Sequence, residues 1–253
     1  MKNIILIAIF LPVILFAQDK SEFKKQVFVD DSSNYLNYRL LYPSNYSSSR
    51  NYPLVIFLHG SGERGNDNEA QLIHGSSLFL EKSNREKYPA FIVFPQMAKG
   101  SSWANLIDWK GPEIKLLEET SHHMKLLFGL LDMLKENLPI DETRIYLSGL
   151  SMGGYGTLDA IMRRPNEFAA ALPICGGGDT SKAATISHIP TWIFHGAVDS
   201  VVPVELSRNM HKALQEAEGN VKYSEYEGVD HNSWDNAFVE EDYLSWMFRQ
   251  RKE

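Results

Sequence analysis

The chain has 253 residues, of which 43% are hydrophobic, and its formal net charge is −7. This length and apolar content suit one large α/β domain with a sizeable core. The negative charge, with no run of basic residues, argues against nucleic acid or an anionic membrane as a partner. Cys175 is the only cysteine, so an internal disulfide is excluded and stability must come from the core.

The first residues are typical of a secretory signal peptide. Lys2 provides a charged start, residues 4–16 are apolar, and Ala17 is a small residue placed for cleavage before Gln18. The alternative is a membrane anchor, but the apolar run is shorter than the roughly 20 residues that a spanning helix needs. We therefore predict a signal peptide at 1–17. We expect a single domain at 18–253, secreted or periplasmic, with no membrane attachment after cleavage.

The predicted elements alternate along the chain. Apolar runs indicate strands at residues 25–30, 38–42, 54–58, 90–95, 144–148, 169–174, 191–195 and 221–226. Helical spacing of apolar residues indicates helices at 71–83, 113–138, 154–164, 204–218 and 235–249. The first two strands are joined by a short polar turn and should pair antiparallel. From residue 54 onward, strands alternate with helices, which predicts an α/β fold with a mainly parallel sheet and helices on both faces.

Ser151 stands at the centre of a G-x-S-x-G motif, between a predicted strand and a predicted helix. In that context the motif indicates a sharp turn that exposes a nucleophilic serine. Gly149 and Gly153 are needed because such a turn leaves no room for a Cβ on either side. A serine hydroxyl also needs a base, and the base needs an acid to orient it.

His231 is the predicted base, because it lies in a polar loop after the last strand, where a parallel sheet forms its sites. Asp199, in the loop after the preceding strand, is the predicted acid, and the order serine, acid, histidine is the one found in α/β-hydrolases. Asp230 and Asp179 are the rival acids. Two other histidines, His59 and His195, end buried strands just before a glycine and are interpreted as shaping loops.

The oxyanion hole should come from two backbone amides. Met152, the residue after the nucleophile, supplies one, and Ser61, in the glycine-rich loop after an earlier strand, is our choice for the other. Trp103 and Trp234 are candidate substrate-binding residues, although each could equally pack a loop. Cys175 is interpreted as a small apolar residue near the site.

Four segments carry a family resemblance: residues 59–66 (HGSGERGN), 149–156 (GLSMGGYG), 173–179 (PICGGGD) and 228–235 (GVDHNSWD). Together they resemble the α/β-hydrolase superfamily. They are most similar to its phospholipase/carboxylesterase and dienelactone-hydrolase-like esterases, including an exported "predicted peptidase" or feruloyl-esterase-like branch. The resemblance implies a catalytic triad of Ser151, Asp199 and His231, an oxyanion hole at Ser61 and Met152, and no cofactor or metal.

These features predict an exported serine hydrolase that cleaves carboxylic esters through an acyl-enzyme. The resemblance implies small-molecule or polysaccharide-linked esters as substrates, such as acyl or feruloyl esters on plant polysaccharide. One alternative is a serine peptidase of the same fold, although nothing in the sequence indicates the propeller or lid domain of such peptidases. The other is a non-catalytic binding protein on a hydrolase scaffold, which usually lacks a triad member. The oligomeric state is not indicated.

Overall fold

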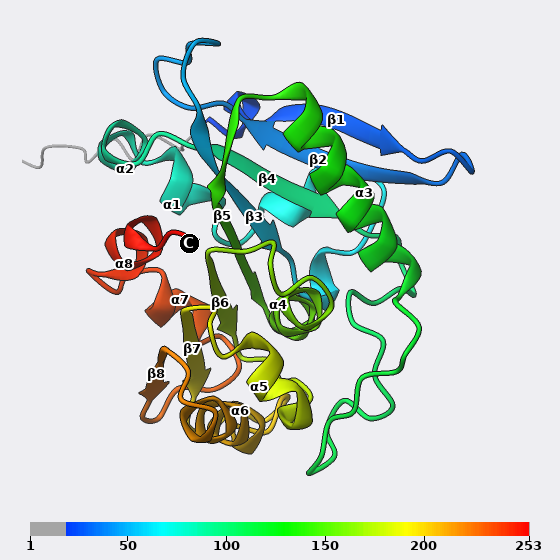
Figure 1. Ribbon diagram of the computed structural model, residues 1–253, viewed down its shortest axis with the longest axis vertical. Coiled ribbons are helices and arrows are strands. Elements are labelled where there is room, and N and C mark those ends of the chain that lie inside the picture. Colours follow the sequence, from blue (N-terminus) through cyan, green and yellow to red (C-terminus); the bar gives the residue numbers. More distant parts are fainter. Residues whose placement is uncertain (1–18, 253) are drawn as a thin grey trace, which may run out of the picture.

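One eight-stranded sheet organises residues 19–252, the part of the chain that the computed structural model describes (Figure 1). Its spatial order is β1-β2-β4-β3-β5-β6-β7-β8. The strands are β1 (Lys24–Val29), β2 (Tyr35–Leu41), β3 (Tyr52–Leu58), β4 (Phe91–Gln96), β5 (Ile140–Leu150), β6 (Ala170–Ile174), β7 (Thr191–Gly196) and β8 (Val221–Tyr226). β2 pairs antiparallel with both β1 and β4, and the other pairings are parallel. The expected mainly parallel sheet with antiparallel N-terminal strands is confirmed.

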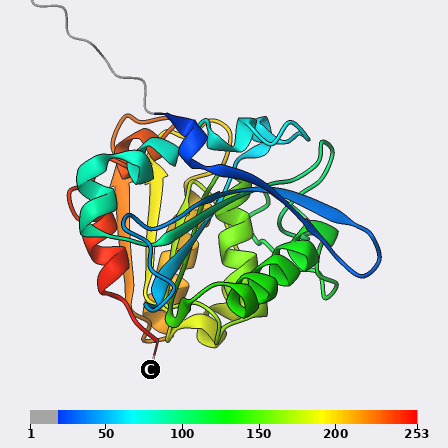
Figure 2. The same cartoon turned by 90° about the horizontal axis from the view of Figure 1, so that it is seen from above.

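Helices cover both faces of this sheet (Figure 2). One face packs against α3 (His122–Asn137), α4 (Met152–Arg163), α5 (Ala183–Ile186) and α6 (Glu205–Glu216). The other face packs against α1 (Ser76–Leu80), α7 (Trp234–Ala237) and α8 (Tyr243–Arg249), and α2 (Lys82–Lys87), which follows α1, has no buried side chain. Short 3₁₀ helices also lie at Lys20–Glu22, Ser61–Glu63, Ala70–Leu72 and Thr180–Lys182.

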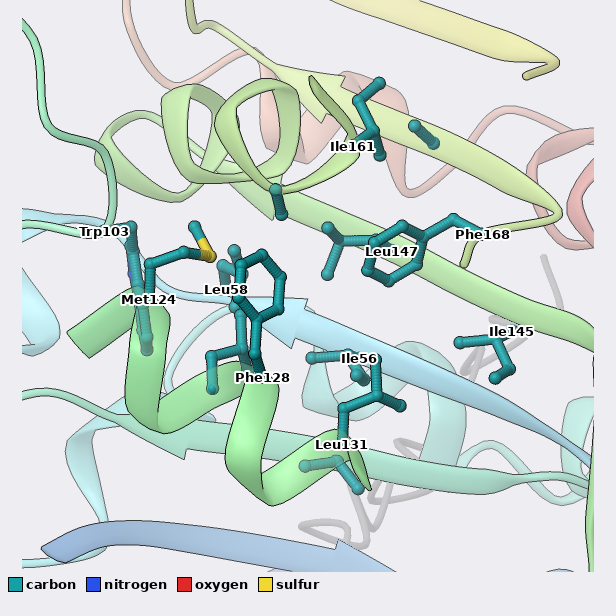
Figure 3. Close-up of a cluster of buried hydrophobic side chains, with 14 of the residues drawn as sticks. Ile56, Leu58, Trp103, Met124, Phe128, Leu131, Ile145, Leu147, Ile161 and Phe168 are labelled. Carbon is teal, nitrogen blue, oxygen red and sulfur yellow. The ribbon is translucent and has the colours of Figure 1, made fainter. Parts of the chain in front are cut away.

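The alternation of side chains along β3 divides the core into two layers. Leu54, Ile56 and Leu58 face α3 and α4, whereas Val55 and Phe57 face the opposite layer of helices. Figure 3 shows the first layer, where Ile56 and Leu58 lie among side chains from α3, α4 and β5. Because both faces are covered, β3 is apolar throughout, and each such side chain contributes roughly 1.5–3 kcal/mol by burial.

Three predicted helices differ from those observed, one in where it begins and two in being interrupted. The helix expected at 113–138 begins only at His122, because Leu116 forms an isolated antiparallel bridge with Leu106 instead. Ser121 then caps the helix, its Oγ accepting a hydrogen bond from the Met124 amide at 3.1 Å. The loop before α3 is therefore longer than the apolar spacing indicated.

The helices expected at 71–83 and 235–249 are both interrupted. In the first, the backbone of Glu81 is extended (φ −56°, ψ 125°), which separates α1 from α2. The second divides into α7 and α8, with a break between Ala237 and Tyr243. Short turns therefore replace long helices on the face of the sheet that α1, α7 and α8 cover.

The signal peptide predicted at 1–17 lies outside the described residues. Within 19–252, no helix combines the length and the apolar character that crossing a membrane requires.

Candidate active site

The turn between β5 and α4 holds Ser151 in an unusual backbone conformation, with φ 54° and ψ −119°. Such a conformation costs about 1–3 kcal/mol, so the surrounding structure must hold it in place. The Ser151 amide donates to the Ile174 carbonyl at 2.9 Å, which ties the turn to β6. A Cβ at Gly149 or Gly153 would clash with the backbone carbonyl of Leu58, so the sharp turn requires both glycines.

The structure brings the three residues of the predicted triad together. His231, in the loop after β8, has its Nε2 at 2.9 Å from the Ser151 Oγ. Its Nδ1 lies 2.8 Å from the Asp199 Oδ2, in the loop after β7. These two hydrogen bonds form the chain that a base-activated serine needs: the carboxylate orients the imidazole, and the imidazole accepts the hydroxyl proton.

The carboxylate of Asp199 is buried and accepts several hydrogen bonds. The amides of Val201 and Val202 each donate to its Oδ1 at 2.8 Å, and its Oδ2 lies 3.2 Å from the His195 Nε2 as well as near His231. Burial alone would raise the pKa of Asp199, but the hydrogen bonds from His195, His231 and the two amides hold it well below its usual range. Asp199 is therefore ionised throughout the neutral range.

His195, which ends β7, is fully buried and contacts the predicted acid. Its Nε2 lies 3.1 Å from the Val202 carbonyl, which can only accept, so Nε2 carries the proton that points toward Asp199. Its Nδ1 lies 2.7 Å from the Ser207 Oγ. The sequence pattern assigned His195 only to loop shaping; its position four residues before Asp199 was the one available signal for this contact.

The two rival acids are engaged elsewhere. Asp230 accepts from the Ser200 amide at 2.7 Å and from the backbone amide of His231 at 2.8 Å. Asp179 accepts from the amides of Leu116 and Ser181. Neither carboxylate has a hydrogen bond to the imidazole ring of His231, so the geometry favours Asp199 as its partner.

A pocket of about 340 Å³ opens beside Ser151. Met152 and Ser61, the predicted oxyanion residues, both line it. Met152 is the first residue of α4, a 12-residue helix, so its amide lies at the helix end whose dipole favours an anion. Trp109 and Tyr155 also line the pocket, with ring centroids 4.8 Å apart, and neither was predicted from the sequence.

The prediction that Trp103 contacts the substrate is not supported by its position. Its side chain is fully buried in the core, and its Nε1 donates to the His59 carbonyl at 3.1 Å. The sequence left open whether Trp103 contacts substrate or packs a loop, and the structure shows packing. Trp234 is only partly buried and lies edge-on to His231, with ring centroids 5.4 Å apart, so its substrate contact stays a prediction.

Cys175, Asp199 and His231 each bring a potential metal ligand to within 4.8 Å of the others. The Asp199 Oδ2 and the His231 Nδ1 are, however, hydrogen-bonded to each other. Burial raises the pKa of the Cys175 thiol, which disfavours the thiolate that a metal would bind. The arrangement therefore suits proton transfer better than metal binding, and Cys175 acts as a small buried residue, as expected.

The sheet order, the turn at Ser151 and the contacts of His231 define a protein of the α/β-hydrolase class. Residues 45–241 match the family described as Phospholipase/Carboxylesterase, and the chain belongs to that family. This match confirms the resemblance to phospholipase/carboxylesterase enzymes.

The chain is also similar to several solved structures and curated proteins. The fold is similar to a thermostable esterase (TM-score 0.84, 40% identity, covering 91% of this chain and 64% of that one). It is also similar to a CE1 ferulic acid esterase from Anaeromyces mucronatus, crystallised with ferulic acid (TM-score 0.64, 18% identity, covering 90% of each chain).

Among curated proteins, poly(3-hydroxyalkanoate) depolymerase C of Paucimonas lemoignei is 31% identical over 128 residues, which is 50% of this chain. A bifunctional acetylxylan esterase/xylanase of Neocallimastix patriciarum is 28% identical over 161 residues, or 63% of this chain. The matched part spans only 28% and 21% of the lengths of these two relatives.

Proposed function

We propose that this protein is a serine hydrolase that cleaves carboxylic esters. The observation that carries the proposal is a pair of hydrogen bonds: His231 Nδ1 donates to the Asp199 carboxylate, and the Ser151 hydroxyl donates to His231 Nε2. The family match supports it, as do the two similar structures whose names describe esterases.

The reaction would begin with Ser151. As its Oγ bonds to the ester carbonyl carbon, its proton passes to the His231 Nε2, and the negative charge that develops on the carbonyl oxygen is met by the amides of Met152 and Ser61. His231 then gives the proton to the departing alcohol. Water repeats the sequence on the acyl-enzyme and releases the acid. Asp199 stays ionised and stabilises the imidazolium, consistent with its lowered pKa.

We propose acyl or feruloyl esters on plant polysaccharide as the substrate class. Two relatives carry such substrates in their names: the acetylxylan esterase/xylanase and the ferulic acid esterase. The pocket also suits an aromatic acyl group, because Trp109 and Tyr155 lie in its wall beside Ser151.

Replacing Ser151 by Ala tests the mechanism. We expect the turnover of 4-nitrophenyl acetate to fall by about 10⁴-fold or more, since the hydroxyl is the attacking group. The unaltered protein should also show an initial burst of nitrophenol that matches the enzyme concentration if the acyl-enzyme accumulates. Equal turnover by the two proteins would refute the serine mechanism.

A feruloyl ester and an acetylated xylan, assayed side by side, would then rank the substrates.

We also propose export, on the basis of the charged and apolar leader at 1–17. N-terminal sequencing of the protein recovered from the periplasm or the medium should begin at Gln18. An uncleaved N-terminus in the membrane fraction would favour the anchor instead.

A further inference from the structure

The pocket beside Ser151 has an excess of positive charge. Arg64 and Lys110 belong to its lining, and among the described residues no aspartate or glutamate does. The chain as a whole carries a net charge of −7, so this local excess runs against its composition. Cations that line a pocket raise the local concentration of anionic ligands and stabilise them once bound.

Arg64 is held in place beside the nucleophile but lacks an acidic partner. Its Nε donates to the Ser61 carbonyl at 2.9 Å, and its Nη1 donates to the Ser101 carbonyl at 3.1 Å. The guanidinium therefore bridges two loops of the pocket, one of which supplies the proposed oxyanion residue. Within residues 19–252, no carboxylate oxygen lies within 4 Å of a guanidinium nitrogen of Arg64.

The free donors of Arg64 suit one kind of ligand. A guanidinium has five N–H groups in a planar fork, and the two backbone carbonyls use only two of them. The remaining fork matches the geometry of a carboxylate, and holding the side chain in advance reduces the entropy lost on binding. Lys110, exposed at the pocket, adds a second, more solvated charge.

We propose that this site selects esters that carry a carboxylate on the acid or alcohol group attached to the reacting ester. Arg64 binds that carboxylate, Lys110 assists it, and the aromatic wall of Trp109 and Tyr155 contacts the group between the carboxylate and the ester. This specificity rests on the proposed esterase function, because it is a preference among the substrates of the reaction that we propose for Ser151.

Two pairs of substrates test the specificity, because the members of each pair differ mainly in charge. On the acid side, the mono-4-nitrophenyl ester of terephthalate is compared with 4-nitrophenyl 4-methylbenzoate. On the alcohol side, 4-acetoxybenzoate is compared with 4-methylphenyl acetate. At pH 7.5 both carboxylates are ionised. We expect kcat/KM for the anionic member to exceed that for the neutral member by about 10-fold or more in one pair. The pair that shows this preference identifies whether Arg64 binds a carboxylate on the acid group or on the alcohol group of the ester.

Variants then separate recognition from a structural role. Arg64→Gln should lower the ratio of anionic to neutral kcat/KM by about 10-fold, mainly through KM, and Lys110→Gln should lower it less. Lys99→Gln is the matched control and should leave the ratio unchanged. Lys99 is exposed on the same loop as Lys110, between β4 and α3, but does not line the pocket. If Arg64→Gln does not fold, Arg64→Lys keeps the charge but loses the fork, and should still lower the ratio.

The outcomes show whether the proposed specificity or the proposed esterase reaction has failed. A ratio near one in both pairs, or the same ratio in the Arg64 variants as in the unaltered protein, would overturn the specificity and leave the esterase proposal standing. An equal fall in the Arg64 and Lys99 variants would reveal only a general effect of charge, and would also overturn it. Unchanged turnover by Ser151→Ala would instead overturn the proposed reaction itself.

Discussion

At the scale of single residues, the environment of Asp199 distinguishes it from the neighbouring carboxylate of Asp230. Asp199 is buried and directs one oxygen at the His231 ring, whereas Asp230 binds Ser200 and the backbone at the surface. In the proposed reaction, the His231 imidazolium needs a fixed negative charge at Nδ1, and Asp199 is the carboxylate that provides one there.

Replacing each aspartate by Asn should therefore give very different results. We expect Asp199→Asn to lower kcat by about 10⁴-fold, since the amide would favour the wrong tautomer of His231. Asp230→Asn, the matched control, should lower it less than about 10-fold. Steady-state kinetics on 4-nitrophenyl acetate measures both variants, and a larger loss in Asp230→Asn would transfer the role of acid to that residue.

The sequence placed the triad candidates better than the pocket residues. Ser151, Asp199 and His231 follow strand ends, and strand ends can be recognised from apolar runs. Which aromatic ring faces the pocket depends instead on packing: Trp103 turns into the core, while Trp109 lines the pocket. No local pattern separates these two tryptophans of the same loop. The charge of Arg64 became informative only when its surroundings were known.

At the scale of elements, the position of Ser151, the proposed nucleophile, depends on how closely α4 approaches β3. The backbone of Gly153, in the first turn of α4, lies against the carbonyls of Leu58 and His59, so there is no space for a side chain. Backbone atoms cannot move aside as a flexible side chain can. This close packing of α4 on β3 therefore fixes the position of Ser151 relative to the ends of the strands.

A methyl group at this contact should be costly. We expect Gly153→Ala to lower the free energy of unfolding by about 3 kcal/mol or more, because the new Cβ forces α4 away from β3. Gly62→Ala is the control, since a Cβ at Gly62 meets no atom within 4 Å, and it should change stability by less than about 0.5 kcal/mol. Urea unfolding compares them; equal stabilities would show that the turn can relax.

The sequence predicted strands best where both faces of the strand are buried. Strands covered on both faces, such as β3 and β4, read as continuous apolar runs. The start of α3 was not predictable, because Leu116 continues the helical spacing but belongs to a loop that bridges Leu106. Contacts between residues distant in sequence decide where such a helix begins, and the spacing of apolar residues alone does not predict those contacts.

At the scale of the whole molecule, stability should depend on two neutral histidines. Burial lowers the pKa of His59 to about 4, and burial also lowers that of His123 to about 4, from the usual 6.5. Both rings accept hydrogen bonds at Nε2, from the Met97 and Ala98 amides respectively, which a protonated ring could not do. The folded state therefore binds fewer protons than the unfolded state between pH 6.5 and 4.

Stability should consequently be complete above pH 6.5 and decline as the pH falls toward 4. His59 alone should account for about 2 kcal/mol of the loss by pH 5. Urea unfolding at intervals from pH 7.5 to 4.5 measures this slope. The His59→Gln and His123→Gln variants should each flatten it, and an unchanged slope in both would exclude these rings as its source.

The order of the sheet also has a consequence in time. Ser151 follows the central strand β5, whereas its proposed base follows β8 at the edge of the sheet, 80 residues further along the chain. A ribosome adds those residues over several seconds, at about 5–20 per second. During that interval the emerging polypeptide carries a serine hydroxyl with no group to deprotonate it. On the proposed mechanism, hydrolysis requires the fold that brings His231 to Ser151, so the onset of hydrolysis would mark the completion of folding.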